Sequence, residues 1–133
     1  MKVAANAFTA LTLPSMGEVL ALLRKGGMDS HTAFDVLTGS LFDGRVHKTY
    51  GGKIVDSRYS PPGMTVPLAV KDLRLALAEA EHMSVPMPAT SLVHDRLVAT
   101  VARGWAALDW SALGLLAETE AGLPESSTHS GRT

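Results

Sequence analysis

The chain has 133 residues, a formal net charge of −1 and 46% hydrophobic residues, enough to bury the core of one ordinary domain. A nucleic-acid partner is not expected, because phosphate binding needs clustered Lys and Arg. There is no cysteine, which excludes disulfides and thiol chemistry, and no two of the five histidines stand four residues apart, so no metal site is expected. The start lacks the pattern of a signal peptide, and no run of 18 apolar residues predicts a membrane span. We therefore expect a cytoplasmic protein.

Apolar residues recur at spacings of three and four from the start of the chain, which predicts helices. The first predicted helix covers residues 2–13 and is expected to break or kink at Pro14. A second is predicted over residues 15–25, because Ser15 and Glu18 have the spacing of a capping box. Two glycines follow its last residue, as is common where a helix ends.

The pattern then changes from helix to loop. A helix is predicted over residues 30–38, with Asp29 or Ser30 as its N-cap and Gly39 at its end. Residues 40–63 contain several glycines and prolines, so we expect a long loop with room for short helical turns. A loop of this length in a compact domain usually carries function.

Two long helices are predicted in the second half of the chain. The first covers residues 65–83, where Leu68, Leu75 and Met83 are among the apolar positions. The second covers residues 88–103 and opens at a proline, which suits the first position of a helix.

The last predicted helix is capped by Asp109 or Ser111 and extends to about Ala117. Residues 1–117 are thus predicted to form one helical domain. Residues 118–133 are rich in Glu, Gly, Pro, Ser and Thr and are predicted to be a disordered tail. No convincing strand is visible, so the predicted fold class is all-α.

Two polar residues near the start have a spacing that suits chemistry. Lys2 and Asn6 are four residues apart, so on a helix they share one face. The lysine can donate or accept a proton while the carboxamide hydrogen-bonds a second substrate oxygen. The same spacing also fits a solvated lysine beside a polar surface residue, so it does not decide between the two interpretations.

Five stretches, taken in order, carry a family resemblance. They are the Lys-x-x-x-Asn of residues 2–6, residues 18–29, Lys71-Asp72-Leu73-Arg74-Leu75-Ala76-Leu77, Val85-Pro86-Met87-Pro88 and residues 104–113. Together they resemble the second domain of the β-hydroxyacid dehydrogenases, the family that includes 3-hydroxyisobutyrate dehydrogenase. The resemblance covers residues 2–116. It implies a helical bundle like the C-terminal domain of 6-phosphogluconate dehydrogenase, with the Rossmann domain absent.

The resemblance also implies roles for single residues. Lys2 would be the catalytic acid/base, and Asn6 would orient the substrate carboxylate or carbonyl. Lys71 would approach the nicotinamide end of the cofactor, and Asp72 would fix that lysine or the local backbone. Met64 stands where the family usually has phenylalanine and would fill the same apolar space near the cofactor.

The implied protein is the substrate-binding and dimerisation domain of an NAD- or NADP-dependent dehydrogenase. No Gly-x-Gly-x-x-Gly follows a strand, so no cofactor is expected to bind this chain alone and its activity is expected to be negligible. A homodimer or higher oligomer is expected, because a lone domain exposes apolar surface. Two alternatives stay open: a stand-alone, non-catalytic helical dimer, and one component of a split enzyme whose Rossmann domain is a separate polypeptide.

Overall fold

The computed structural model describes residues 1–125, which form six α-helices and one short 3-10 helix. In chain order they are α1 (Lys2–Lys25), α2 (Ser30–Thr38), α3 (Arg45–Val55), α4 (Val66–His82), α5 (Pro88–Ala102), η1 (Trp110–Ala112) and α6 (Leu113–Glu120). The described residues form no strand, and only an isolated bridge joins Thr65 to Asp109. The predicted all-α fold class is confirmed.

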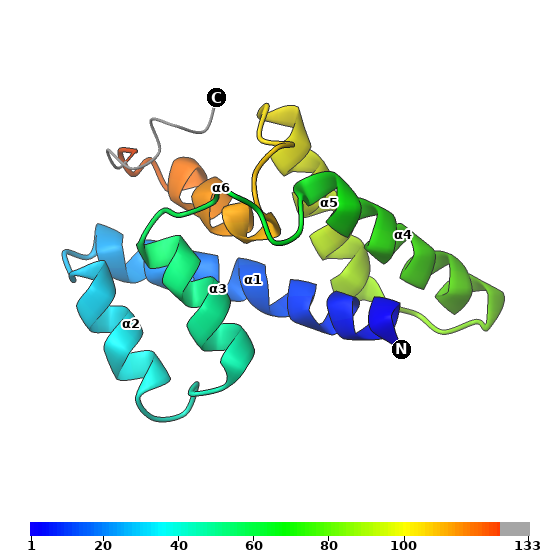
Figure 1. The fold of residues 1–133 in the computed structure, drawn as a ribbon, viewed down its shortest axis with the longest axis horizontal. Helices are drawn as coiled ribbons and strands as arrows, with labels where there is room; N and C mark the ends of the chain where they lie inside the picture. The colour runs from blue at the N-terminus through cyan, green and yellow to red at the C-terminus, as the bar shows by residue number, and fades with distance from the viewer. Residues whose placement is uncertain (126–133) are drawn as a thin grey trace.

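The longest helix, α1, runs through the middle of the molecule (Figure 1). The α2–α3 hairpin lies against one end of α1, and α4 and α5 lie against the other. The last helix, α6, packs along α1 and closes the bundle. Because α1 contacts every other α-helix, its side chains decide how the two ends of the molecule are joined.

Two buried apolar clusters form the core, and α1 contributes to both. Ala10 and Leu13 of α1 are fully buried in the first cluster, between α4, α5 and α6. Leu20 of α1 lies in the second, with Ile54 of α3 and Leu115 of α6. One helix therefore connects both clusters, and changes along α1 affect the whole domain.

The expected break at Pro14 and the separate helix beginning at Ser15 are wrong. Pro14 lies inside α1, which continues on both sides of it. A proline in a helix interior removes one hydrogen bond and costs about 3 kcal/mol or more. The buried residues Leu13 and Leu20 hold both halves of α1 against the core, so tertiary packing outweighs the local preference.

The expected loop over residues 40–63 is also partly wrong, because it contains the whole of α3. Gly51 and Gly52 signalled a loop but lie inside this helix. A Cβ built on Gly51 would lie 2.6 Å from Cε2 of Phe34 on α2. The glycine is there because α2 and α3 approach closely, which is a packing requirement and not a turn.

The other predicted helices are confirmed with small shifts at their ends. Asp29 caps α2 by accepting a hydrogen bond of 3.0 Å from the Thr32 N–H. The last helix extends to Glu120, beyond the predicted end at 117. Residues 126–133 of the predicted tail lie outside the described part of the chain.

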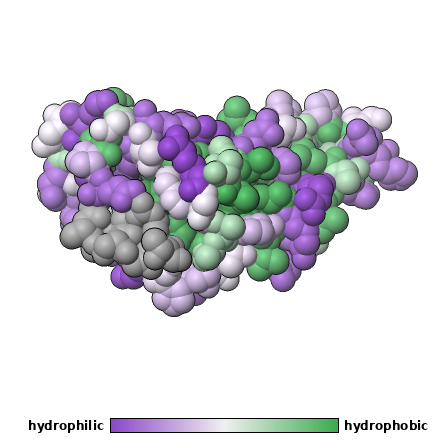
Figure 2. Space-filling view, turned by 90° about the horizontal axis from the view of Figure 1, so that it is seen from above, coloured by the Kyte–Doolittle hydropathy of each residue, from purple (hydrophilic) through white to green (hydrophobic). Residues whose placement is uncertain are grey.

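Several apolar residues used to predict α4 are not in the core. Leu68, Leu75 and Met83 are all exposed, while Val66, Ala69 and Leu73 are the residues that α4 buries. Hydrophobic surface is also visible on the face of the molecule drawn in Figure 2. The domain thus keeps apolar surface that its own helices do not cover.

By length and composition α1 passes the test for a membrane-spanning helix, with a mean hydropathy of 1.2 over 18 residues. It lies near the N-terminus, and 33% of that window is buried in the fold. Buried core helices pass the same test. The contacts of α1 with the other five α-helices explain its apolar character as that of a central helix.

Because α1 and α6 cross closely, we expect a methyl group added at Gly17 to lower the stability of the domain. A Cβ added to Gly17 would lie 2.8 Å from the Cα of Gly114, so the α6 backbone would have to move. We expect Gly17→Ala to lower the free energy of unfolding in urea by about 1–3 kcal/mol. The matched control is Gly26→Ala, whose added Cβ would meet only carbonyl oxygens at 3.5 Å. Equal losses in the two variants would contradict the close crossing.

Candidate active site

A hydrogen bond joins the start of α1 to the middle of α4. The Asn6 Nδ2 donates to Oδ2 of Asp72 at 2.7 Å, across 66 positions in sequence. Asn6 is half-buried, and Asp72 is buried with 9% of its surface exposed. Two of the residues that the sequence proposed for the site are therefore in direct contact.

This contact fixes the orientation of the Asn6 amide. An ionised carboxylate only accepts hydrogen bonds, so the NH₂ group of Asn6 must face Asp72. The described residues give the Asn6 side chain no other hydrogen bond. One N–H and the carbonyl oxygen of Asn6 are then without a hydrogen-bond partner among the described residues.

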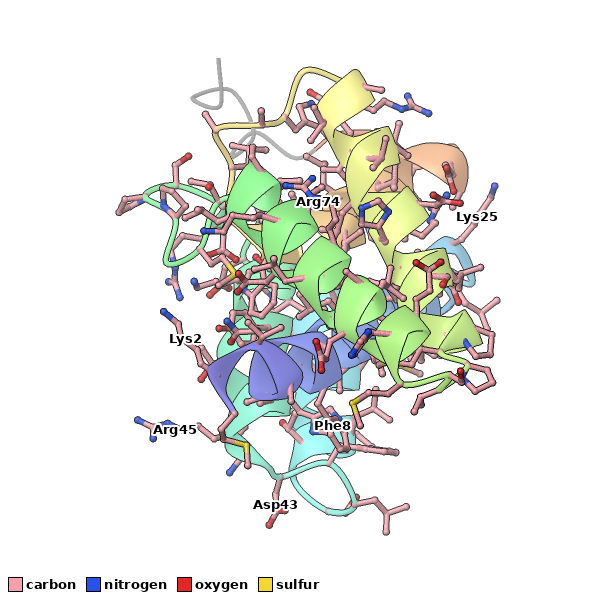
Figure 3. All side chains as sticks on the ribbon, turned by 90° about the vertical axis from the view of Figure 1, so that its right-hand side faces the viewer. Lys2, Phe8, Lys25, Asp43, Arg45 and Arg74 are labelled. Atoms are coloured by element: carbon pink, nitrogen blue, oxygen red, sulfur yellow. The ribbon has the colours of Figure 1, made fainter. Side chains whose placement is uncertain are left out.

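The two candidate lysines lie on the surface on either side of this pair. Lys2 is the first residue of α1, one turn before Asn6, and its side chain projects away from the body of the molecule (Figure 3). Lys71 is exposed on α4, next to Asp72. Asp72 accepts the hydrogen bond from Asn6, and among the described residues no ion pair joins it to Lys71. Its expected role in fixing Lys71 or the local backbone stays a prediction.

The energy of the Asn6–Asp72 contact can be measured by a double-mutant cycle. We expect Asn6→Ala and Asp72→Ala to be coupled by about 1–2 kcal/mol in the free energy of unfolding, since one partner of the hydrogen bond is charged. The matched pair Asn6→Ala and Asp95→Ala, with an exposed aspartate on α5, should show no coupling beyond about 0.5 kcal/mol. Additive effects of the first pair would show that the contact does not hold α1 to α4.

Met64 lies just before α4, in a backbone segment held by a buried carboxylate. Asp109 Oδ2 accepts from the N–H groups of Gly63 at 2.9 Å and Met64 at 3.4 Å. The same oxygen accepts from Nζ of Lys53, on α3, at 3.0 Å. Met64 is half-buried against the first core cluster. Its position is thus set by a fixed backbone on one side and by apolar packing on the other.

The charge of Asp109 is stabilised where it is buried. Burial alone would raise the pKa of this carboxyl, but hydrogen bonds from Ser111, Lys53 and Gly63 outweigh it, and the net effect lowers the pKa. Its second oxygen, Oδ1, accepts from the Ser111 N–H at 2.9 Å. The carboxylate joins α3, η1 and the segment before α4 into one rigid unit.

Sequence reasoning identified Asp109 only as a helix cap and did not select Lys53. The cap was visible because Asp109 and Ser111 are two residues apart. The contacts with Lys53 and Gly63 span 56 and 46 positions, and no local pattern reports such distances. The glycine before Met64 was the one available signal that another group approaches the backbone there.

The chain matches the family model described as "NAD-binding of NADP-dependent 3-hydroxyisobutyrate dehydrogenase" over residues 1–116. It is 30% identical over 112 residues to 2-hydroxy-3-oxopropionate reductase from Escherichia coli. The aligned region covers 84% of this chain and 38% of the reductase.

Two solved structures share the fold. A 3-hydroxyisobutyrate dehydrogenase from Salmonella typhimurium superposes with a TM-score of 0.79 at 23% identity, over 86% of this chain and 40% of that one. The enzyme of the same name from Mycobacterium tuberculosis gives a TM-score of 0.75 at 26% identity, over 86% and 41%. The chain spans about two fifths of the length of the proteins it matches.

Proposed function

Since this chain belongs to the 3-hydroxyisobutyrate dehydrogenase family, we propose that it is the substrate-binding and dimerisation domain of an NAD(P)-dependent β-hydroxyacid dehydrogenase. The observation that carries the proposal is the hydrogen bond between Asn6 and Asp72. It unites two of the five residues proposed for the site, and it leaves a carboxamide with a donor and an acceptor one turn from Lys2.

In the proposed reaction Lys2 removes the hydroxyl proton of the substrate while Asn6 hydrogen-bonds a second oxygen and holds the reacting carbon in place. The nicotinamide dinucleotide supplies the acceptor for the hydride that leaves this carbon. The residues proposed for its binding fit such a group, because Lys71 offers an exposed cation and Met64 a half-buried apolar surface.

The experiment that tests the proposal compares two polypeptides. The polypeptide that carries this chain, as cells make it, should reduce NAD or NADP in the presence of 3-hydroxyisobutyrate or a similar acid. The 133-residue chain alone should have negligible activity, since the described residues contain no βαβ unit to bind a dinucleotide. Activity of the 133-residue chain alone would contradict the proposal that a separate domain binds the dinucleotide. Inactivity of the cellular polypeptide on all β-hydroxy acids would contradict the proposed dehydrogenase reaction.

We also propose that the chain forms homodimers through the groove between the start of α1, the end of α4 and the loop before α5. This groove, of about 700 Å³, is lined mainly by apolar side chains, among them Phe8, Leu75 and Met83. All three are exposed, and apolar surface of this kind favours association. The proposal includes a cytoplasmic location, in agreement with the reductase and dehydrogenase names of the relatives.

The proposed dimer can be tested by placing one charged side chain in the groove. At micromolar concentration the chain should sediment at twice the mass of one copy, and Leu75→Glu should shift it to a single copy because a carboxylate would face the apolar groove. Leu75 is already 51% exposed, so the variant should still fold. Leu41→Glu is the matched control, on an exposed leucine after α2 and outside the groove. A wild-type chain that sediments as one copy would overturn the proposal.

A further inference from the structure

A second pocket lies beside the proposed site, between α1 and the first turn of α3. It has a volume of about 470 Å³, and its mainly apolar lining includes Phe8 and Val46. Ala5, Thr9 and Thr12 form the rest of its α1 side. These residues follow Lys2 and Asn6 along the helix at spacings of three and four, so they continue the same side of α1. Ala5, which lines the pocket, is the residue before Asn6 in the chain, so the pocket begins next to the proposed site.

The α3 side of the pocket places one cation and one imidazole beside the apolar Val46. Arg45 and His47 line it, and the His47 ring packs against Phe42 with centroids 5.5 Å apart. In Figure 3, Lys2 and Arg45 project from the same side of the molecule, while Asp43 lies apart from both. The pocket therefore combines an apolar lining, which includes Phe8 and Val46, with a cation on the side that Lys2 also faces.

Arg45 has no carboxylate partner among the described residues, and it is exposed. Arg24 pairs with Glu118, Arg58 with Asp56, and Arg96 with both oxygens of Glu120. Arg74 and Arg103 also have no ion pair among the described residues, but neither lines this pocket. A guanidinium that lines a pocket without a carboxylate partner is suited to bind a carboxylate of a ligand through two hydrogen bonds.

We infer that Arg45 is a specificity-determining residue and that the substrate class is the hydroxy dicarboxylic acids, whose second carboxylate is directed to the pocket between α1 and α3. This inference rests on the proposed function, because the reacting end of the substrate is placed at Lys2 and Asn6. Arg45 binds the second anionic group, and Asn6 binds an oxygen at the reacting end.

The experiment uses two acids that differ by a single group. Malate is 3-hydroxybutyrate with its methyl group replaced by a carboxylate. Each is titrated into the ¹⁵N-labelled 133-residue chain, and amide shifts are followed by NMR. We expect malate to shift the resonances of residues 44–47 and to bind with a Kd about tenfold lower than that of 3-hydroxybutyrate. Arg45→Gln should abolish this difference, while Arg58→Gln, the same change at an arginine outside the pocket, should preserve it.

The outcomes separate this inference from the proposed function. Two outcomes overturn the inference alone. In the first, both acids shift the Asn6 resonances with equal Kd values. In the second, the Arg45→Gln variant binds malate like the wild type. If neither acid shifts the Asn6 side-chain amide, the proposed function fails and the inference fails with it.

Discussion

Replacing Asp109 with alanine is expected to lower the free energy of unfolding by about 3–5 kcal/mol, because it leaves a cation and several backbone donors without their acceptor. The carboxylate is fully buried and accepts from Lys53, Gly63 and Ser111. The Lys53 ammonium, of which 19% of the side chain is exposed, would lose its ion pair. Urea unfolding followed by circular dichroism measures the loss.

Two comparisons show whether the loss comes from this carboxylate. Asp35→Ala removes an exposed aspartate on α2 and should change the free energy of unfolding by no more than about 0.5 kcal/mol. Lys53→Met leaves Asp109 with its backbone donors and should cost less than Asp109→Ala. If Asp109→Ala cost no more than the surface control, the contacts around the carboxylate would not contribute to stability.

The lowered pKa of Asp109 gives the same prediction a pH dependence. A group with a lower pKa in the folded state stabilises the fold above its unfolded value of 3.8, and this stabilisation is lost as the pH falls through the folded pKa. The wild-type free energy of unfolding should therefore decline in acid below about pH 3.8. In Asp109→Ala this part of the decline should be missing.

Replacing Lys2 with methionine is expected to lower kcat of the polypeptide that carries this chain by about 10²–10⁴-fold, the range for losing a general acid or base. Methionine keeps a long side chain but can neither accept nor release a proton. Lys2 is exposed at the start of α1, so the fold should not change. Steady-state oxidation of 3-hydroxyisobutyrate with NAD or NADP measures the effect.

The controls separate proton transfer from charge. Lys2→Arg keeps the positive charge, but a guanidinium does not release its proton at neutral pH, so kcat should stay low. Lys25→Met changes a lysine at the other end of the same helix and should leave kcat unchanged. A Lys2→Met enzyme with wild-type kcat would exclude Lys2 as the acid or base.

The helices were predictable where one local signal dominated, and not where distant packing reversed it. Asp29 and Pro88 mark helix starts in the sequence and in the structure. Pro14 and Gly51 are local helix breakers, yet both lie inside helices. The side chains against which Leu13 and Leu20 pack, and the Phe34 ring over Gly51, come from other parts of the chain. Neither is visible in a local pattern.

The candidate site, too, was predictable from the sequence only in part. Lys2, Asn6 and Asp72 were selected from the family resemblance, but only the fold brings Asn6 and Asp72 together. Arg45 lies within residues 40–63, which the sequence predicted to be a loop. Its place at a pocket beside α1 depends on α3 being a helix, so that wrong prediction also hid the polar side of the pocket.

The pairing of α1 with α6 has a consequence for synthesis on the ribosome. Contacts between these helices join residues far apart in the sequence, such as Arg24 and Glu118. When α1 leaves the exit tunnel, the helix that covers it has not yet been translated. The side of α1 that α6 covers therefore stays exposed in the nascent chain until α6 emerges, and the domain closes only then. Because chains are synthesised at roughly 5–20 residues per second, this exposed interval lasts several seconds, and it is the period in which a chaperone would have the most surface to bind.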